Sequence, residues 1–296
     1  MNVIYFLIFS LIFLSYTFTN FTVGYFYLAT PDRHYALTAP LKSGQDFTAE
    51  LTADSYLAID KQTKKELVAK AADEVRPIAS LTKLMTDQII VDQLSDWQQR
   101  VTLETSDFRQ GGSFYLRNGE QLSTDDLFHL SLIASDNVAT LALVRQTGLT
   151  ESEFVSLMNQ RARLLGLEKT VFIEPTGVDP QNQSTARELM IIASQAFAKK
   201  KIQEITNLNN YYIKVNEGEQ RLIRNTNLLL ADQGVKALRG KTGYIPEAGY
   251  CLASELAAND SNSFYVVVLG SDYDEGRFVE TKEIADWTRD NFIFYN

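Results

Sequence analysis

The sequence is poor in the residues that most often carry hydrolytic or metal chemistry. Its 296 residues include one cysteine, Cys251, and two histidines, His34 and His129. A single cysteine excludes an intrachain disulfide. No group of nitrogen, sulfur and oxygen ligands has the spacing of a metal site, so we predict no metal and no other cofactor. The shortage of histidine also argues against a Ser-His-Asp or Cys-His mechanism, and a hydrolase of this sequence is expected to use another base.

Positive charge is also scarce. The chain has 28 lysines and arginines against 37 acidic residues, which gives a net charge of −9. No basic stripe interrupts this acidity, and nucleic acid is therefore excluded as a partner. The hydrophobic share of 45% and the charged share of 22% are those of a globular protein with one large core or two closely packed lobes.

Charge is absent from the beginning of the chain. Residues 3–30 contain no charged side chain and are mainly apolar, and the first basic residue is Arg33. Such a stretch can cross a bilayer, which needs about 20 apolar residues. We favour an uncleaved membrane anchor over a cleaved secretory signal, because no lysine or arginine precedes the apolar run and no clear cleavage site follows it. A buried core helix is the third alternative. The expected location is extracytoplasmic, with residues 31–46 as a polar linker.

The hydrophobic pattern predicts strands near both ends of the folded part and helices between them. An α+β fold follows, in which both ends of the chain form an antiparallel sheet flanked by helices, with a helical lobe inserted at about residues 100–205. The expected strands are residues 49–60, 67–70, 211–215, 237–244, 250–256 and 264–269, and the expected helices start at Ser80, Thr124, Asp136, Glu151, Thr185 and Glu275.

The only Ser-x-x-Lys pattern joins Ser80 to Lys83 at the start of the helix expected over residues 80–94. Three residues apart on a helix, the hydroxyl and the amine lie on one face within hydrogen-bond reach. A partly desolvated lysine with a lowered pKa can then accept the serine proton in place of a histidine. Alone the pattern is weak evidence, because it occurs by chance about once in a chain of this size.

A second pattern, Ser-x-Asn, lies between two expected helices. Considered alone, Ser135 is best explained as a helix N-cap, a role that serine often fills at such junctions. In the functional interpretation, Ser135 relays a proton to the leaving amine, and the side-chain amide of Asn137 fixes the substrate backbone.

The third pattern consists of Lys241, Thr242 and Gly243 within the strand expected over residues 237–244. An ordinary surface strand is the plain alternative. However, Gly240 precedes the Lys-Thr pair, and a glycine on each side indicates close approach by another group. A ligand peptide that adds to this strand edge would explain the glycines, with the lysine and threonine meeting a carboxylate.

In this order the three patterns are the signature of penicillin-binding proteins and serine β-lactamases. From about residue 45 to residue 292, the chain resembles the low-molecular-mass D-alanyl-D-alanine carboxypeptidases and endopeptidases of peptidase family S11. The resemblance implies a β-lactamase/transpeptidase-like fold, with a serine peptidase domain over residues 47–292. Further stretches that look like the family are residues 76–79, 111–113, 174–177, 184–187, 224–227 and 248–251.

The resemblance implies a serine-type carboxypeptidase that trims the D-Ala-D-Ala ends of peptidoglycan stem peptides. Ser80 would attack the carbonyl between the two D-alanines, and Lys83 would take its proton. Ser135 would pass a proton to the departing D-alanine. β-Lactams would acylate the serine and leave slowly. The other implied site residues are Asn137 for the peptide, Lys241, Thr242, Gly243 and Arg224 around the terminal carboxylate, and the backbone N–H groups of Ser80 and Tyr244 for the oxyanion.

One departure from the family pattern keeps alternatives open. The middle residue of the second motif is Asp136, where this family more often has glycine or alanine and class A β-lactamases have aspartate. Those β-lactamases also need a Glu-x-x-Leu-Asn stretch, which neither Glu174 nor Glu188 begins. A β-lactamase is therefore a less favoured alternative, as is a non-catalytic penicillin-binding module. Residues 76–80 and 172–177 also look like the endopeptidase branch of the family, so the main alternative is a DD-endopeptidase that cleaves peptide crosslinks.

Overall fold

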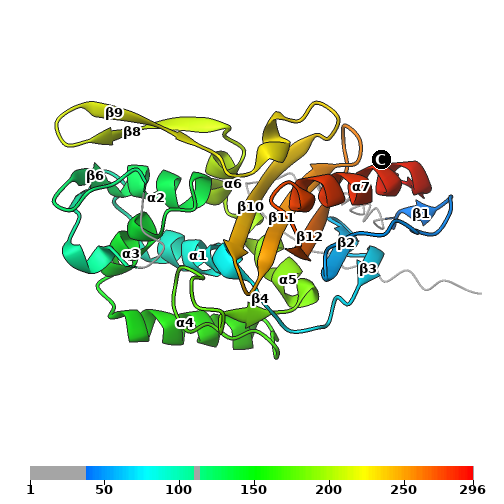
Figure 1. Cartoon of the computed structure of the whole chain (residues 1–296), viewed down its shortest axis with the longest axis horizontal. Helices are drawn as coiled ribbons and strands as arrows, with labels where there is room; N and C mark the ends of the chain where they lie inside the picture. Colours follow the sequence, from blue (N-terminus) through cyan, green and yellow to red (C-terminus); the bar gives the residue numbers. More distant parts are fainter. Residues whose placement is uncertain (1–37, 110–113, 296) are drawn as a thin grey trace, which may run out of the picture. The chain divides into compact units, whose positions relative to one another are not determined.

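A computed structural model of the chain describes residues 38–109 and 114–295 (Figure 1). The expected leader, residues 3–30, and the family-like residues 111–113 lie outside the described residues. In the described part of the chain, no helix is both long enough and apolar enough to span a membrane. The three sequence motifs all lie within the described residues.

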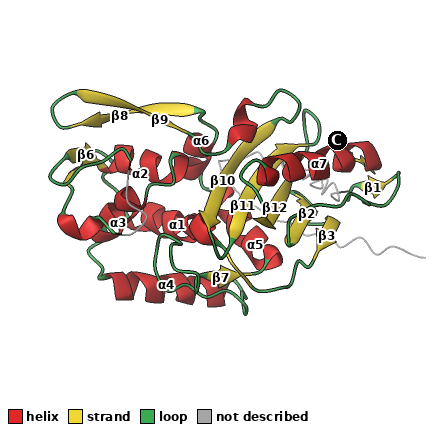
Figure 2. Cartoon of the chain, in the orientation of Figure 1, coloured by secondary structure: helices red, strands yellow, loops and turns green. Residues whose placement is uncertain are grey.

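The central element is a five-stranded antiparallel sheet to which both ends of the chain contribute, as the sequence predicts (Figure 2). The strand order is β10-β11-β12-β2-β3. Strand β12 joins the two halves through its pairing with β2, in which Val266 faces Ala58. The strand expected from residue 49 begins only at residue 55. The strands are β2 (Ser55–Asp60), β3 (Glu66–Lys70), β10 (Ala237–Ile245), β11 (Gly249–Ala257) and β12 (Ser263–Ser271).

Strand β12 is buried along its whole length because helices cover both faces of the sheet. Alternate side chains of a strand point to opposite faces. Val266 accordingly packs with Ile284 of α7 (Gly276–Asn291), whereas Val267 belongs to the core cluster of α5 (Ala186–Ala198). This closing helix, which is expected to start at Glu275, begins at Gly276 and ends at Asn291, and Phe292 begins a short strand.

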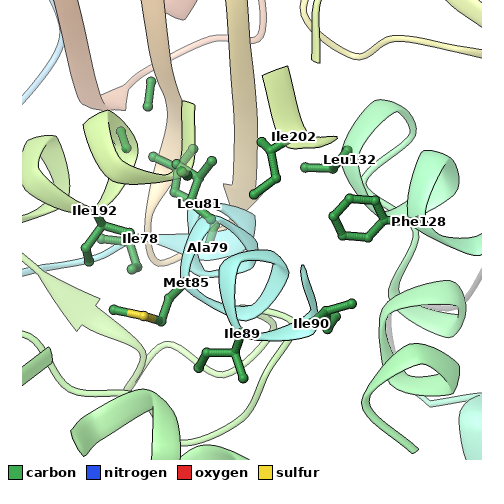
Figure 3. Close-up of a cluster of buried hydrophobic side chains, with 14 of the residues drawn as sticks. Ile78, Ala79, Leu81, Met85, Ile89, Ile90, Phe128, Leu132, Ile192 and Ile202 are labelled. Atoms are coloured by element: carbon green, nitrogen blue, oxygen red, sulfur yellow. The ribbon is translucent and has the colours of Figure 1, made fainter. Parts of the chain in front are cut away.

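Helix α1 (Lys83–Gln93) lies at the centre of the helical lobe, and its first eight residues are buried. Met85 and Ile89 project from it into a cluster that includes Phe128 and Ile192 (Figure 3). Side-chain caps begin several helices, among them α2, where Ser123 accepts a hydrogen bond from the Asp126 N–H group. The other helices of the lobe are α2 (Thr124–Ile133), α3 (Asn137–Gln146), α4 (Glu151–Leu164) and α6 (Lys200–Thr206).

Short two-stranded pairings and 3₁₀ turns complete the fold, and most of them were not expected from the sequence. They bring together segments too short for a period to be recognised. Leu41–Lys42, within the expected linker, forms one of them. The pairs are β1 (Leu41–Lys42) with β13 (Phe292–Ile293), β4 (Arg76–Pro77) with β7 (Gln183–Ser184), β5 (Arg100–Thr102) with β6 (Gln121–Ser123), and β8 (Asn210–Val215) with β9 (Glu219–Arg224); the turns are η1 (Ala79–Thr82), η2 (Thr105–Asp107) and η3 (Leu228–Ala231).

Candidate active site

Ser80 lies in the 3₁₀ turn η1, immediately before α1, and not within an α-helix as the sequence predicts. The turn begins at Ala79, whose φ of 47° is in the left-handed region that residues other than glycine rarely adopt. The predicted contact is nevertheless present, because Lys83 Nζ donates a hydrogen bond of 3.0 Å to Ser80 Oγ. The hydroxyl is partly exposed, whereas the amine beneath it is fully buried.

Three oxygen acceptors surround the Lys83 amine. Besides Ser80 Oγ, it donates to Asn137 Oδ1 at 2.6 Å and to the backbone oxygen of Thr176 at 2.7 Å. Burial lowers the Lys83 pKa to about 8, against the opposing pull of nearby carboxylates, of which Glu174 is the strongest. At pH 7 about a tenth of this lysine is therefore the free amine, far more than for an ordinary lysine, and this form can accept the serine proton.

Ser135 is not the N-cap of α3. That position is filled by Asp136, whose side chain accepts a hydrogen bond of 2.9 Å from the Ala139 N–H group. This cap gives the unusual middle residue of the motif a structural role. Ser135 itself has a φ of 58°, and its Oγ accepts a hydrogen bond of 2.6 Å from Lys241 Nζ. The alternative explanation of Ser135 as a simple cap is therefore wrong.

Lys241 is the second buried lysine of the site, with 1% of its surface exposed. Its pKa lies well below the ordinary value, because of burial first and the positive charge of Lys83 second, while Asp87 opposes the shift. The neighbouring Thr242 is linked by its hydroxyl to Thr226 at 2.5 Å. Two amines and two serine hydroxyls thus form adjoining hydrogen-bonded pairs, an arrangement that can move protons at the nucleophile and at a leaving group.

Glu174 shapes the loop that presents the Thr176 carbonyl to Lys83. One carboxylate oxygen accepts hydrogen bonds from the N–H and the hydroxyl of Thr176, both at 2.6 Å. The other accepts from the N–H groups of Gly177 and Val178 and from the side chain of Asn182. Both oxygens are thus engaged within the loop. This arrangement suits a positioning role and not the activation of a deacylating water, the role that a class A β-lactamase would require.

Strand β10 is an edge strand of the sheet. It carries the third motif and packs against the turn that contains Ser80. A Cβ built on Gly243 would lie 3.1 Å from the Ser80 nitrogen and from the Ile78 carbonyl oxygen. This glycine therefore permits close approach by the protein's own backbone, and the addition of a ligand peptide to this strand edge stays a prediction. Tyr244 follows Gly243 on the same strand and pairs with Tyr250 of β11.

Arg277 is a cation next to the site that sequence reasoning missed. It projects from the first turn of α7, forms an ion pair with Asp274 and donates a hydrogen bond of 3.2 Å to the Gly243 carbonyl. No local pattern marks it, because it meets β10 only through the packing of α7 on the sheet. Arg224, which the resemblance implied, is the last residue of β9, and its side chain is exposed.

His129 lies outside this constellation. It is buried on α2, its Nδ1 is 2.8 Å from the Asp125 carbonyl oxygen, and its ring stacks on Tyr211 at 3.8 Å. No group of three or more potential metal ligands occurs among residues 38–109 and 114–295. The free thiol of Cys251 is buried, which raises its pKa to about 11.

Comparisons with known proteins place this geometry in a family. The sequence model of peptidase family S11, described as D-alanyl-D-alanine carboxypeptidase, matches residues 42–272. The chain belongs to this family. It is a serine hydrolase, and its activity is that of a serine DD-peptidase. The membership accounts for the order of the three motifs, which the fold brings to one place.

Relatives of two activities are similar to this S11 peptidase. A D-alanyl-D-alanine endopeptidase of Haemophilus influenzae is 35% identical over 203 residues, which are 68% of this chain and 69% of the relative. A D-alanyl-D-alanine carboxypeptidase of Bacillus subtilis is 29% identical over 86% of this chain and 67% of its own length. The crystal structure of a Streptomyces DD-transpeptidase superposes with a TM-score of 0.75 at 26% identity, and covers 82% of this chain and 99% of its own.

Substitution of Gly177 tests whether the contact between the Glu174 loop and the Ser80 turn contributes to stability and to acylation. A Cβ at this position would lie 1.9 Å from the Ala79 carbonyl oxygen, and the residue has a φ of 88°. We expect Gly177→Ala to lower the free energy of unfolding by about 3 kcal/mol and to slow acylation of Ser80. Urea unfolding and labelling with a fluorescent penicillin measure the two effects.

Gly148→Ala is the matched control. Gly148 has a φ of 76°, but a Cβ there would meet nothing within 4 Å. Because only backbone strain is added, Gly148→Ala should lower the free energy of unfolding by about 1 kcal/mol and leave acylation unchanged. Equal losses of stability in the two variants would show that the approach of Gly177 to the Ala79 carbonyl contributes nothing.

Proposed function

We propose that this enzyme is a D-Ala-D-Ala carboxypeptidase that removes the terminal D-alanine from peptidoglycan stem peptides through an acyl-enzyme on Ser80. The observation that carries the proposal is the 3.0 Å hydrogen bond between a partly exposed serine hydroxyl and the fully buried amine of Lys83. That pair supplies a nucleophile and a base without a histidine. The family description and the DD-carboxypeptidase relatives support the substrate class.

The first half of the reaction follows from the two serine–lysine pairs. Lys83 takes the hydroxyl proton while Ser80 Oγ attacks the carbonyl carbon of the penultimate D-alanine. The backbone N–H groups of Ser80 and Tyr244 stabilise the resulting oxyanion, an interaction worth several kcal/mol in such sites. Ser135, bonded to Lys241 at 2.6 Å, passes a proton to the leaving amine, and the C–N bond breaks. The proton that Lys83 took from Ser80 replaces the one that Ser135 lost, so that Lys83 is again a free amine.

The second half of the reaction is hydrolysis of the ester. Water donates a proton to the free amine of Lys83, attacks the acyl carbon and releases the shortened peptide, while the Ser80 oxygen regains its proton. β-Lactams enter the same first step, but their leaving group stays attached to the acyl moiety, so we propose that they inhibit by slow deacylation. We propose that Lys241 and Thr242, which are both buried, hold the substrate carboxylate, that Arg224 adds charge there, and that Asn137 holds the peptide.

A DD-endopeptidase is the second candidate. The observation that favours it is the name of three relatives at 30–35% identity, all described as D-alanyl-D-alanine endopeptidases. Incubation of the enzyme with a free stem pentapeptide and, separately, with a crosslinked dimer distinguishes the two by chromatography of the products. We expect release of D-alanine from the pentapeptide. Cleavage of the dimer alone would replace the carboxypeptidase proposal with the endopeptidase.

We also propose that the enzyme acts outside the cytoplasmic membrane, attached through residues 3–30. The substrate class supports the location, and the uncharged apolar composition of that segment supports the attachment. Membrane fractionation of the full chain, compared with a chain in which lysines replace four apolar residues of the segment, tests the attachment. Recovery of both proteins in the soluble fraction would contradict it.

A further inference from the structure

Asp87 is a fully buried carboxyl that the mechanism above does not use. It lies on α1 one helical turn after Lys83, on the same face of the helix. Its Oδ1 is 3.0 Å from Ser131 Oγ, whereas its Oδ2 has no hydrogen-bond partner among the described residues. A buried carboxylate oxygen without a partner destabilises the folded state, so the presence of an aspartate one turn from Lys83 calls for an explanation.

A chain of hydroxyl groups connects Asp87 to the turn that carries the second motif. Ser131 Oγ lies 2.9 Å from Thr140 Oγ1, and Thr140 Oγ1 donates to the Asp136 backbone oxygen at 2.7 Å. The chain therefore has three links, but the two hydroxyls supply only two hydrogens. Ser131 donates to the Asp87 carboxylate and Thr140 donates to the Asp136 oxygen, so both hydrogens are used and Asp87 is bonded as an acceptor. The chain of hydroxyls thus connects the Asp87 carboxylate to the Ser135–Asn137 turn.

The charges that face Asp87 are those of the two catalytic lysines. Burial raises the Asp87 pKa to about 7, against the opposing effects of the Ser131 hydrogen bond and of the lysines. The carboxylates that act on Lys83 are Glu174, Asp87 and Asp136. Lys241 is influenced by Asp87 and, with the opposite sign, by Lys83 and Arg277.

We propose that Asp87 is a positioning residue of the reaction, whose buried carboxyl supplies the shared counter-charge of Lys83 and Lys241 and so sets the pH at which Lys83 becomes the free base. The proposal rests on the proposed function, because it takes Lys83 as the base for Ser80. A carboxylate near an amine favours the ammonium form. Removal of the carboxylate therefore favours the free amine, and acylation should extend to lower pH.

The experiment measures the second-order rate of acylation by a fluorescent penicillin from pH 5 to pH 10. In the unaltered enzyme the rate rises with pH as Lys83 loses its proton. In Asp87→Asn, which removes the charge with little change of shape, we expect this rise to move to lower pH by about one unit. At pH 7 the variant should then be acylated several-fold faster than the unaltered enzyme.

Thermal unfolding at pH 8 separates this role from a structural one. An aspartate with a raised pKa is penalised in the folded state once the pH exceeds its unfolded value. Asp87→Asn should therefore be at least as stable as the unaltered enzyme. Asp107→Asn is the matched control, since Asp107 is equally buried but pairs with Arg145. It should lose stability and keep the original pH profile.

The outcomes are distinct. If Asp87→Asn does not fold, acylation is measured across pH in the double variant Asp87→Ala with Ser131→Ala, which also removes the bonded hydroxyl. The same shift to lower pH is expected. An unmoved or upward-shifted pH profile in a folded variant overturns the role of Asp87 and leaves the proposed function intact. Failure of the unaltered enzyme to be acylated at any pH contradicts the proposed function, and the Asp87 inference with it.

Discussion

Replacement of Ser80 by alanine should reduce kcat/KM for the pentapeptide by about ten-thousand-fold or more. The variant loses the oxygen that forms the acyl-enzyme, and no other described hydroxyl accepts a hydrogen bond from Lys83. The loss should appear in kcat, because the groups expected to bind the peptide and its carboxylate are unaltered. Steady-state release of D-alanine measures the effect.

Ser131→Ala is the control for the serine prediction. Ser131 is buried and hydrogen-bonded, but it does not contact the Lys83 amine. Its removal should change kcat/KM far less than removal of Ser80. Circular dichroism shows whether each variant is folded. A folded Ser80→Ala enzyme that keeps more than about a tenth of the activity would mean that another group is the nucleophile.

Replacement of Lys83 by methionine should slow acylation of Ser80 by about a thousand-fold, the range expected for loss of a general base. Because burial lowers the Lys83 pKa to about 8, the free amine is the minor form below that pH. In the unaltered enzyme, acylation should therefore rise as the pH increases towards 8 and level off above it. In Lys83→Met this rise should disappear. Stopped-flow labelling with a fluorescent penicillin across pH measures both effects.

Lys61→Met is the matched substitution for this test. Lys61 is partly exposed and pairs with Glu255 on the sheet, so its loss removes a lysine without touching the three motifs. Acylation by this variant should have the rate and the pH profile of the unaltered enzyme. If Lys83→Met retained the pH-dependent rise, a group other than Lys83 would be the titrating base.

Much of the fold can be predicted from the sequence because its long helices and strands have clear hydrophobic periods. The sequence predicts a strand over residues 264–269, and the structure contains it as the centre of β12, with α5 and α7 packed on its two faces. The limits of the elements are less well predicted. The predicted helix that begins at Ser80 starts as a 3₁₀ turn, since the left-handed backbone at Ala79 and the contact with Gly177 depend on distant segments.

The candidate site is predictable to the extent that its chemistry is local. The three-residue spacing of Ser80 and Lys83 fixes their contact within one turn of chain, and the structure contains that contact. The contact between Lys241 and Ser135 joins segments over a hundred residues apart, and only the resemblance to a family could place the two motifs together. Their roles in catalysis stay predictions.

Other residues of the site could not be found from any pattern. Asp136 interrupts the family motif, and only the structure reveals its side chain as the cap of α3. Arg277 and Asp87 are ordinary helix residues in the sequence, and packing alone brings them to β10 and to the two lysines. For the contact of Arg277 with β10 and for the effect of Asp87 on Lys241, a local pattern was absent because the partner lies in a different part of the chain.

The central claim, a nucleophilic Ser80 in a penicillin-sensitive DD-peptidase, is tested most directly by mapping the site of acylation. The enzyme is incubated with penicillin at pH 8, and its intact mass and proteolytic peptides are measured by mass spectrometry. We expect one penicillin per chain, on the peptide that contains Ser80, and no adduct in Ser80→Ala. An unmodified enzyme, or an adduct on a different peptide that persists in Ser80→Ala, would contradict the account.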